Sequence, residues 1–296
     1  MRDEIRKIQE LMESAEYVTD APVATSVYLA MSLRKPLLIE GHAGVGKTEV
    51  AKVMARMLGT NLIRLQCYEG LDAAMALYEW NYQKQLLHIK LTEGSSRSAD
   101  EKEHEIFSEP FLLRRPLLQA ISQDGQSPVL LIDECDRADE EFEAFMLEIF
   151  AEWQVTIPEV GTIRATHPPH VILTSNRTRE LSDALRRRCL YLWIDYPTLE
   201  KEVRIVERKV PGIDARLARE IARFMETLRT VRLSKVPGVA ETLDWAHALA
   251  ALHADHLDEE LVAETLGCIL KDADDIRRFR AEVAKGGLAP FLPVPS

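Results

Sequence analysis

Hydrophobic positions in the first two thirds of the chain form short apolar runs separated by segments with helical periodicity. Runs such as "PLLIE" and "PVLLIDE" are too short and too apolar for surface helices and predict buried strands. Strands and helices in alternation are typical of a parallel α/β sheet. We therefore expect an α/β fold with a parallel five-stranded sheet. The predicted strands cover residues 36–40, 61–67, 128–134, 170–176 and 190–197.

Amphipathic patterns between these runs predict helices, which cover residues 3–16, 22–33, 49–59, 111–123 and 140–153. Residues 154–165 have the pattern of a β-hairpin that turns near Glu159 to Gly161. The stretch 94–108, "GSSRSADEKEHEIFS", is polar and rich in turn formers. We interpret it as a mobile surface loop.

After Pro197 the pattern is helical, with breaks at "VPGID" and "KVPGVA", and no convincing strand is predicted. We therefore expect two domains. Residues 1–197 form an α/β domain that includes the N-terminal helices, and residues 198–296 form a small all-α domain.

Composition narrows the possible partners. The 296 residues carry 37 Lys and Arg against 48 Asp and Glu, a net charge of −11, which disfavours nucleic acid and anionic membranes. No apolar run approaches the ~18 residues that span a bilayer, and the first twenty residues are charged throughout. We expect a cytoplasmic protein without membrane insertion. Four widely spaced cysteines without a Cys-x-x-Cys pair fit reduced buried thiols better than disulfides or a zinc site.

The most specific motif is "GHAGVGKT", which matches G-x-x-x-x-G-K-[ST] between a predicted strand and a predicted helix. Backbone N–H groups of such a turn surround a β-phosphate, Lys47 neutralises β- and γ-phosphate oxygens, and Thr48 ligates Mg²⁺. The sequence therefore predicts an ATP and Mg²⁺ site. Its predicted nucleotide-binding residues are Gly41, His42, Ala43, Gly44, Val45, Gly46, Lys47, Thr48 and Glu49.

A second element, "VLLIDE", brings Asp133 and Glu134 to the carboxyl edge of the sheet, where open α/β folds bind ligands. Asp133 would hold Mg²⁺ through its hydration shell, and Glu134 would polarise a water for attack on the γ-phosphate. The alternative is an acidic pair that only ends a strand and caps the next helix. A carboxylate beside the nucleophile favours hydrolysis over transfer of the phosphoryl group.

Two further positions are candidates for the same reaction. Asn176 ends a predicted strand, so its amide could reach the γ-phosphate or the attacking water; the alternative is an Asx turn. Arg186, Arg187 and Arg188 precede the last strand, and one of them could supply a guanidinium to a neighbouring molecule's γ-phosphate. The alternative for these arginines is a solvated basic cluster or a nucleic-acid contact.

Taken together, these elements resemble the AAA+ ATPases, and within them the MoxR family, from Ser26 to Pro197 and more loosely through a helical lid. "GHAGVGKT" is similar to the family's Walker A, "LLIDE" to its Walker B, and Asn176 to its sensor 1. Arg188 stands where the family has its arginine finger, with Arg187 the next candidate. The resemblance makes Lys47, Glu134, Asn176 and Arg188 the expected catalytic residues, with Thr48 and Asp133 at the metal.

The segments "YEWNYQKQLL" and "LTEG" further resemble the CoxD group, MoxR-type ATPases encoded with carbon monoxide dehydrogenase and related molybdenum hydroxylases. Another MoxR branch that shares these residues is the alternative. The resemblance implies a homo-oligomeric ring, a hexamer, with ATP between subunits. It also implies a partner with a von Willebrand A domain and a metalloenzyme client whose maturation the ATPase drives.

One position departs from the family. Many MoxR relatives carry a sensor 2 arginine at the start of a lid helix, whereas Glu241 stands there in "VPGVAETLDWA". No arginine lies between Arg232 and Arg277. We therefore assign no sensor 2 residue.

Several aromatic, histidine and cysteine residues lie outside these motifs, and we interpret them as structural rather than functional. We favour core packing over client contact for the aromatic residues of 68–82, and surface histidines over a metal site for "HADH" (253–256). "HPPH" (167–170) reads as a loop, and Cys135 as a small buried residue rather than a redox sensor. Two other functions remain open: a slow nucleotide-dependent scaffold, and a DNA-directed AAA+ protein, which the acidic charge disfavours.

Overall fold

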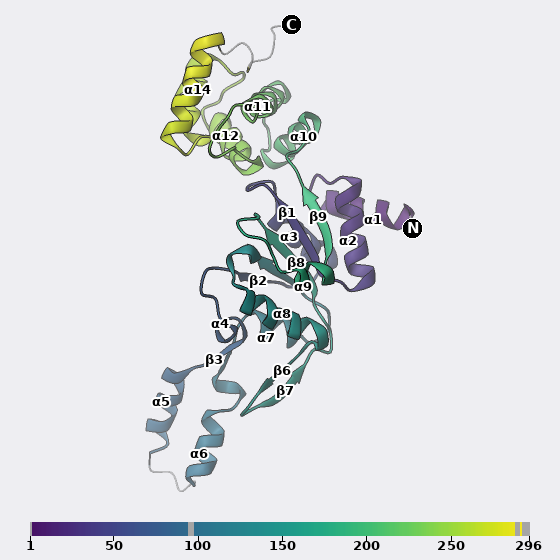
Figure 1. The fold of residues 1–296 in the computed structure, drawn as a ribbon, viewed down its shortest axis with the longest axis vertical. Helices are drawn as coiled ribbons and strands as arrows, with labels where there is room; N and C mark the ends of the chain where they lie inside the picture. The colour runs from purple at the N-terminus through teal and green to yellow at the C-terminus, as the bar shows by residue number, and fades with distance from the viewer. Residues whose placement is uncertain (1, 94–97, 288–290, 292–296) are drawn as a thin grey trace.

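The computed structural model describes residues 2–93, 98–287 and 291 (Figure 1). At its centre lies a parallel sheet of five strands in the order β2-β5-β8-β1-β9. The predicted α/β class with a five-stranded parallel sheet is confirmed. The strands are β1 (Leu37–Gly41), β2 (Leu62–Gln66), β5 (Val129–Asp133), β8 (His170–Ser175) and β9 (Leu190–Ile194).

Helices cover both faces of this sheet. Along β1, Leu37 and Ile39 pack toward α1 (Arg2–Ser14), α2 (Ala21–Leu33) and α3 (Lys47–Leu58), while Leu38 packs on the opposite face with α7 (Pro116–Ile121) and α8 (Glu140–Glu152). All five residues of β1 and of β5 are buried. Strands buried on both faces explain the continuous apolar runs in the sequence.

An insertion between β2 and β5 projects from the sheet at the end opposite to the C-terminal helices (Figure 1). Two short strands pair antiparallel at its base, and two helices extend beyond them. Trp80 at the base is buried against Phe107, whereas Tyr68 and Tyr82 are exposed. The insertion contains α4 (Ala73–Leu77), β3 (Tyr78–Trp80), α5 (Tyr82–Leu91), α6 (Ala99–Ile106), η1 (Glu109–Phe111) and β4 (Leu112–Arg114).

Two expectations for this insertion are wrong. Within 94–108, predicted as a loop, α6 forms because the Ser98 hydroxyl accepts the Glu101 N–H and the Glu101 carboxylate accepts the Ser98 N–H; residues 94–97 lie outside the described residues. The single helix predicted over 111–123 begins only at Pro116, since proline favours the first helical position, and β4 precedes it.

The predicted hairpin is confirmed as β6 (Gln154–Ile157) and β7 (Gly161–Arg164), and it follows α8. The short helices η2 (Cys135–Arg137) and α9 (Asp183–Arg188) follow β5 and β8, respectively.

Every described element after β9 is helical, and these helices share a core of their own in which Phe224 contacts Trp245. We refer to this region as the lid. It contains α10 (Leu199–Lys209), α11 (Ala215–Leu228), α12 (Val239–Ala251), α13 (Glu259–Thr265), η3 (Leu266–Cys268) and α14 (Ala273–Gly286). Of the helices in the described part of the chain, none combines the length and the apolar character needed to cross a bilayer.

Candidate nucleotide-binding site

The loop from Gly41 to Gly46 joins β1 to α3 at the carboxyl edge of the sheet. Gly46 is the N-cap of α3 at φ 94°, a left-handed conformation that favours glycine. No side chain caps this helix end, so N–H groups of its first turn remain for an anion. The local structure is that of a phosphate-binding loop.

Lys47 is buried at the start of α3. Its Nζ donates to the carbonyls of Gly41 (2.8 Å) and His42 (2.6 Å) and to Oδ1 of Asn176 (2.7 Å). Burial lowers the pKa of Lys47, opposed by nearby carboxylates of which Asp136 is the strongest. Lys47 and Asn176, far apart in the sequence, are therefore in direct contact.

The carboxylate of Asp133, at the end of β5, accepts four hydrogen bonds from the described residues. Its Oδ1 receives the hydroxyls of Thr48 (3.0 Å) and Thr174 (2.5 Å), and its Oδ2 receives Nε (3.0 Å) and Nη2 (2.6 Å) of Arg64. Sequence reasoning missed Arg64 and Thr174, although each is a polar residue within an apolar strand. The pairing of Thr48 with Asp133 brings the two predicted metal-binding side chains together.

Glu134 follows directly and lies at φ 54°. Its N–H donates to the Thr174 hydroxyl (2.9 Å), and its carboxylate, about one third exposed, pairs with Nε of Arg137 at 2.9 Å. Thr174 thus bridges the backbone of Glu134 and the carboxylate of Asp133. This hydroxyl therefore holds the side chain of Asp133 and the main chain of Glu134 in place.

Asp136 is a further residue that the sequence did not reveal. It is buried, and its carboxylate accepts the N–H groups of Asn176 (3.2 Å) and Thr178 (2.8 Å) and the Thr178 hydroxyl (2.7 Å). These bonds hold the loop after β8, and with it the side chain of Asn176, against Lys47.

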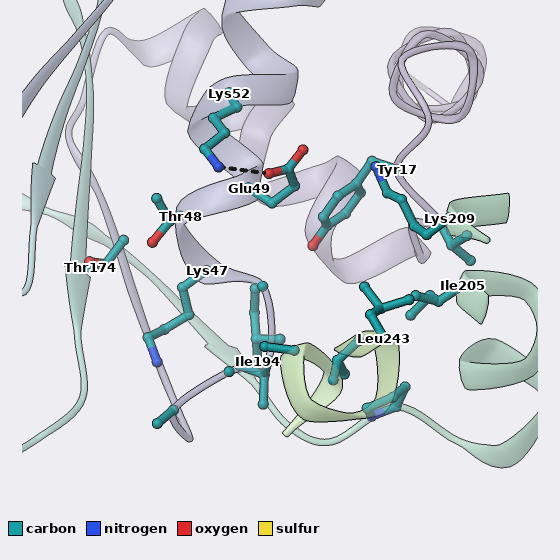
Figure 2. Close-up of a pocket in the computed structure, with 18 of the residues that line it drawn as sticks. Tyr17, Lys47, Thr48, Glu49, Lys52, Thr174, Ile194, Ile205, Lys209 and Leu243 are labelled. Carbon is teal, nitrogen blue, oxygen red and sulfur yellow. Dashed lines mark ion pairs between the residues drawn. The ribbon is translucent and has the colours of Figure 1, made fainter. Parts of the chain in front are cut away.

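One end of a cavity of about 540 Å³ is lined by Lys47, Thr48, Asp133, Glu134, Thr174 and Asn176. The opposite end is formed by Tyr17, before α2, and by Ile205 and Leu243 of the lid, as Figure 2 shows. Burial raises the pKa of Tyr17 far above its ordinary value, so its hydroxyl stays neutral. Lys209 lies beside Ile205 at this opposite end (Figure 2). A phosphate-binding end facing an end with aromatic and aliphatic side chains suits a ligand with phosphates and a flat base.

Seven of the nine predicted nucleotide-binding residues, Ala43 to Glu49, line this cavity. Gly41 and His42 do not. Gly41 ends β1, and the His42 ring stacks on Tyr196 with 4.6 Å between centroids.

Comparison with known families agrees with this geometry. Residues 36–189 match the AAA domain, dynein-related subfamily. The chain belongs to this family. The match covers four of the five strands of the sheet, β1, β2, β5 and β8, and it ends at Cys189, immediately before β9. It supports nucleotide binding and hydrolysis at the level of the family.

Individual relatives of this AAA protein are distant. The gas vesicle ATPase GvpN of Haloferax mediterranei is 25% identical over 279 residues, which are 88% of this chain and 76% of GvpN. The denitrification regulatory protein NirQ of Stutzerimonas stutzeri is 24% identical over 215 residues, covering 70% and 68%. A mutant of Thermotoga maritima RuvB, 16% identical, matches with a TM-score of 0.51 over 96% of this chain and 76% of that one, which supports the fold alone.

The three arginines of the AAA domain's α9 are exposed and lie outside the cavity. Arg186 is 3.9 Å from Glu40, and Arg188 donates to the carbonyl of Ala184 within its own helix (3.3 Å). Arg187 makes no ion pair with any residue that the structure describes. None of the three can therefore act on this chain's own cavity in this conformation.

Glu241 stands at the position where many MoxR relatives carry a sensor 2 arginine. Its side chain has a partner within the lid. It stands in the first turn of α12, and its Oε2 accepts the N–H of Gly238 at 2.8 Å. The carboxylate thus caps the helix, and it also lies beside the phosphate-binding loop, since a Cβ atom on Gly44 would be 3.1 Å from its Oε2.

The remaining candidates lie elsewhere in the AAA protein. His256 pairs with Asp255 on the surface, and His170 begins β8. Within the described residues, no group of three His, Cys, Asp or Glu side chains could hold a metal ion. Cys135 is buried, and burial raises its pKa, which disfavours a reactive thiolate.

Proposed function

We propose that this protein is a MoxR-type AAA+ ATPase that hydrolyses ATP with Mg²⁺ and uses the cycle to remodel a protein client. The observation that carries the proposal is a convergence of five residues from two strand ends and one helix at the polar end of one cavity: Lys47, Thr48, Asp133, Glu134 and Asn176.

The donor set fits a magnesium nucleotide. The Thr48 hydroxyl and the Asp133 carboxylate are 3.0 Å apart, and both are oxygen donors of the kind that Mg²⁺ prefers. They would hold the metal, which when bound neutralises phosphate charge. The cavity of about 540 Å³ is within the size range of ligand pockets.

Each residue then has a distinct task. Lys47 exchanges its carbonyl partners for phosphate oxygens, and Asn176 orients the γ-phosphate or the attacking water. Glu134 accepts a proton from that water, which requires its carboxylate to leave Arg137. Because Arg137 is exposed and Glu134 is about one third exposed, water screens this ion pair, and breaking it costs only about 0–1 kcal/mol.

Arg188 would act in a neighbouring subunit. It is exposed at the end of α9 and, among the described residues, bonds only to a carbonyl of its own helix, whereas Arg186 is close to Glu40. Because Arg188 is exposed and lies outside this chain's own cavity, we propose a hexameric ring in which Arg188 of one copy completes the site of the next. Arg187 is the second candidate for this role.

For the client, the resemblance to MoxR ATPases supports a von Willebrand A partner and a metalloenzyme. Within that class, the CoxD-like segments favour a molybdenum hydroxylase such as a carbon monoxide dehydrogenase. The names of GvpN and NirQ point to different systems, so they support the ATPase and not one client.

The test compares the wild type with Glu134→Gln and Lys47→Ala. We expect wild-type phosphate release, retained ATP binding without turnover in Glu134→Gln, and loss of ATP binding in Lys47→Ala, measured by phosphate assay and by fluorescent nucleotide titration. A wild type that assembles partners with ATP and never releases phosphate would instead support a scaffold.

The client is tested by trapping Glu134→Gln with ATP in a lysate and identifying the proteins that co-purify. A von Willebrand A protein together with a molybdenum hydroxylase supports the narrow proposal. Replication proteins, or ATP-dependent DNA binding that salt abolishes, would contradict it.

A further inference from the structure

The first turn of lid helix α12 lies directly on the phosphate-binding loop. The N–H of Ala240 donates to the carbonyl of Gly44 at 3.1 Å. A Cβ atom on Gly238 would lie 2.6 Å from the carbonyl oxygen of Ala43 and 2.9 Å from the Cα of Gly44. Only glycine fits at 238, so the lid meets the loop backbone to backbone.

A second contact joins the same loop to the lid through side chains. The ring of His42 stacks on Tyr196 with an interplanar angle of 9°, and the guanidinium of Arg229 lies 4.8 Å from the centroid of the Tyr196 ring. Nε of Arg229 donates to the carbonyl of Pro237 at 3.0 Å, and Pro237 directly precedes Gly238. The two contacts are therefore connected through the lid. We call the connected set His42, Tyr196, Arg229 and Gly238 the circuit.

The lid side of this circuit is rigid. Arg229 is buried and donates two bonds to the Glu202 carboxylate, at 2.6 and 2.7 Å, and a third to the Thr242 hydroxyl at 3.2 Å. Glu202 belongs to α10, Arg229 caps α11, and Thr242 belongs to α12. Bidentate pairs of this kind fix geometry, so three lid helices hold the segment that contacts the loop.

We propose that Gly238 is a positioning residue for the phosphate-binding loop, and that the circuit of His42, Tyr196, Arg229 and Gly238 makes loop and lid move together. This inference rests on the proposed ATPase function and extends it. Glu241 stands where many MoxR relatives carry a sensor 2 arginine. In this chain the lid instead responds to the nucleotide through the conformation of the loop itself.

The test uses two lid glycines that differ in their surroundings. In Gly238→Ala the added methyl collides with the loop, whereas in Gly267→Ala it meets nothing within 4 Å. We expect Gly238→Ala to bind a fluorescent ATP analogue about tenfold more weakly, because overpacking shifts the loop, and Gly267→Ala to match the wild type. Circular dichroism and the melting temperature confirm that each variant is folded.

A second readout needs no nucleotide. Hydrogen–deuterium exchange of the free protein should speed up in the segment 41–46 in Gly238→Ala and stay at the wild-type rate in Gly267→Ala. Unchanged exchange in Gly238→Ala overturns the proposal, whatever the ATPase does. If exchange responds but the wild type neither binds nor hydrolyses ATP, the positioning role stands and the proposed function fails.

His42→Ala provides an independent variant should Gly238→Ala not fold. Its side chain is about half exposed, so the substitution leaves the core intact. Loss of the stack with Tyr196 should raise hydrogen–deuterium exchange in the segment 41–46 by a smaller factor than Gly238→Ala does. Wild-type exchange in His42→Ala would remove Tyr196 and Arg229 from the circuit.

Discussion

Two regions of the molecule reverse the usual burial of apolar residues and exposure of polar ones. The polar end of the cavity buries charged side chains, and helix α5 of the insertion exposes apolar side chains. At the cavity, Lys47 and Asp133 are buried, and each has several partners within the chain. In α5, Gln85 is buried and donates to the carbonyl of Ile106, while Leu86 and Leu87 are exposed. Contacts within one chain thus account for the buried charges, whereas the exposed leucines contribute little to its fold.

This comparison predicts where substitutions act. Changes at the cavity should alter stability or chemistry strongly because buried polar groups lose defined partners. Changes on the outer face of α5 should leave both almost unaffected.

The largest effect is expected for a residue outside the cavity. Arg188→Ala should lower turnover roughly 10³-fold, the lower range for an arginine supplied to γ-phosphate charge, and leave nucleotide affinity of the single chain unchanged. Steady-state phosphate release and nucleotide titration measure the two. Arg186→Ala is the matched control, since Arg186 lies near Glu40 in its own chain. Equal turnover in Arg188→Ala and the wild type would mean that the site is complete within one subunit, or that Arg187 acts instead.

Thr174→Val should cost about 1–3 kcal/mol of unfolding free energy, because it leaves the Glu134 N–H and one bond to Asp133 without their buried partner. Urea denaturation followed by circular dichroism measures the change. Thr174→Ser keeps the hydroxyl and serves as the control. If valine and serine prove equally stable, the hydroxyl does not organise the acidic pair.

The smallest effect is expected in α5. Leu86→Ser and Leu87→Ser should each change the unfolding free energy by no more than about 0.5 kcal/mol, because both side chains are mostly exposed. Leu118→Ala, fully buried beneath the sheet, should cost roughly 2–5 kcal/mol in the same assay. A large loss in the serine variants would show that α5 packs against other residues in solution, and the contrast between the two regions would disappear.

Much of the fold and the centre of the site could be predicted because their signals are local in sequence. The phosphate loop, the acidic pair after β5 and the five buried strands each occupy one short stretch. Three partners in the site could not be predicted: Arg64, Thr174 and Asp136. Their contacts depend on how the strands pair; Gln66 of β2, for example, stands opposite Asp133. Helix α6 was missed because its polarity outweighed a capping-box spacing, Ser98 to Glu101, that was visible in the sequence.

The hydrogen bond between the Ala240 N–H and the Gly44 carbonyl uses main-chain atoms alone. Any residue except proline could stand at 240 and still donate it. Such a contact can persist while the surrounding sequence diverges, and a search for conserved arginines in lid helices would pass over it. Among distant ATPases, the absence of a recognisable sensor residue is therefore poor grounds for classing a lid as uncoupled from its nucleotide.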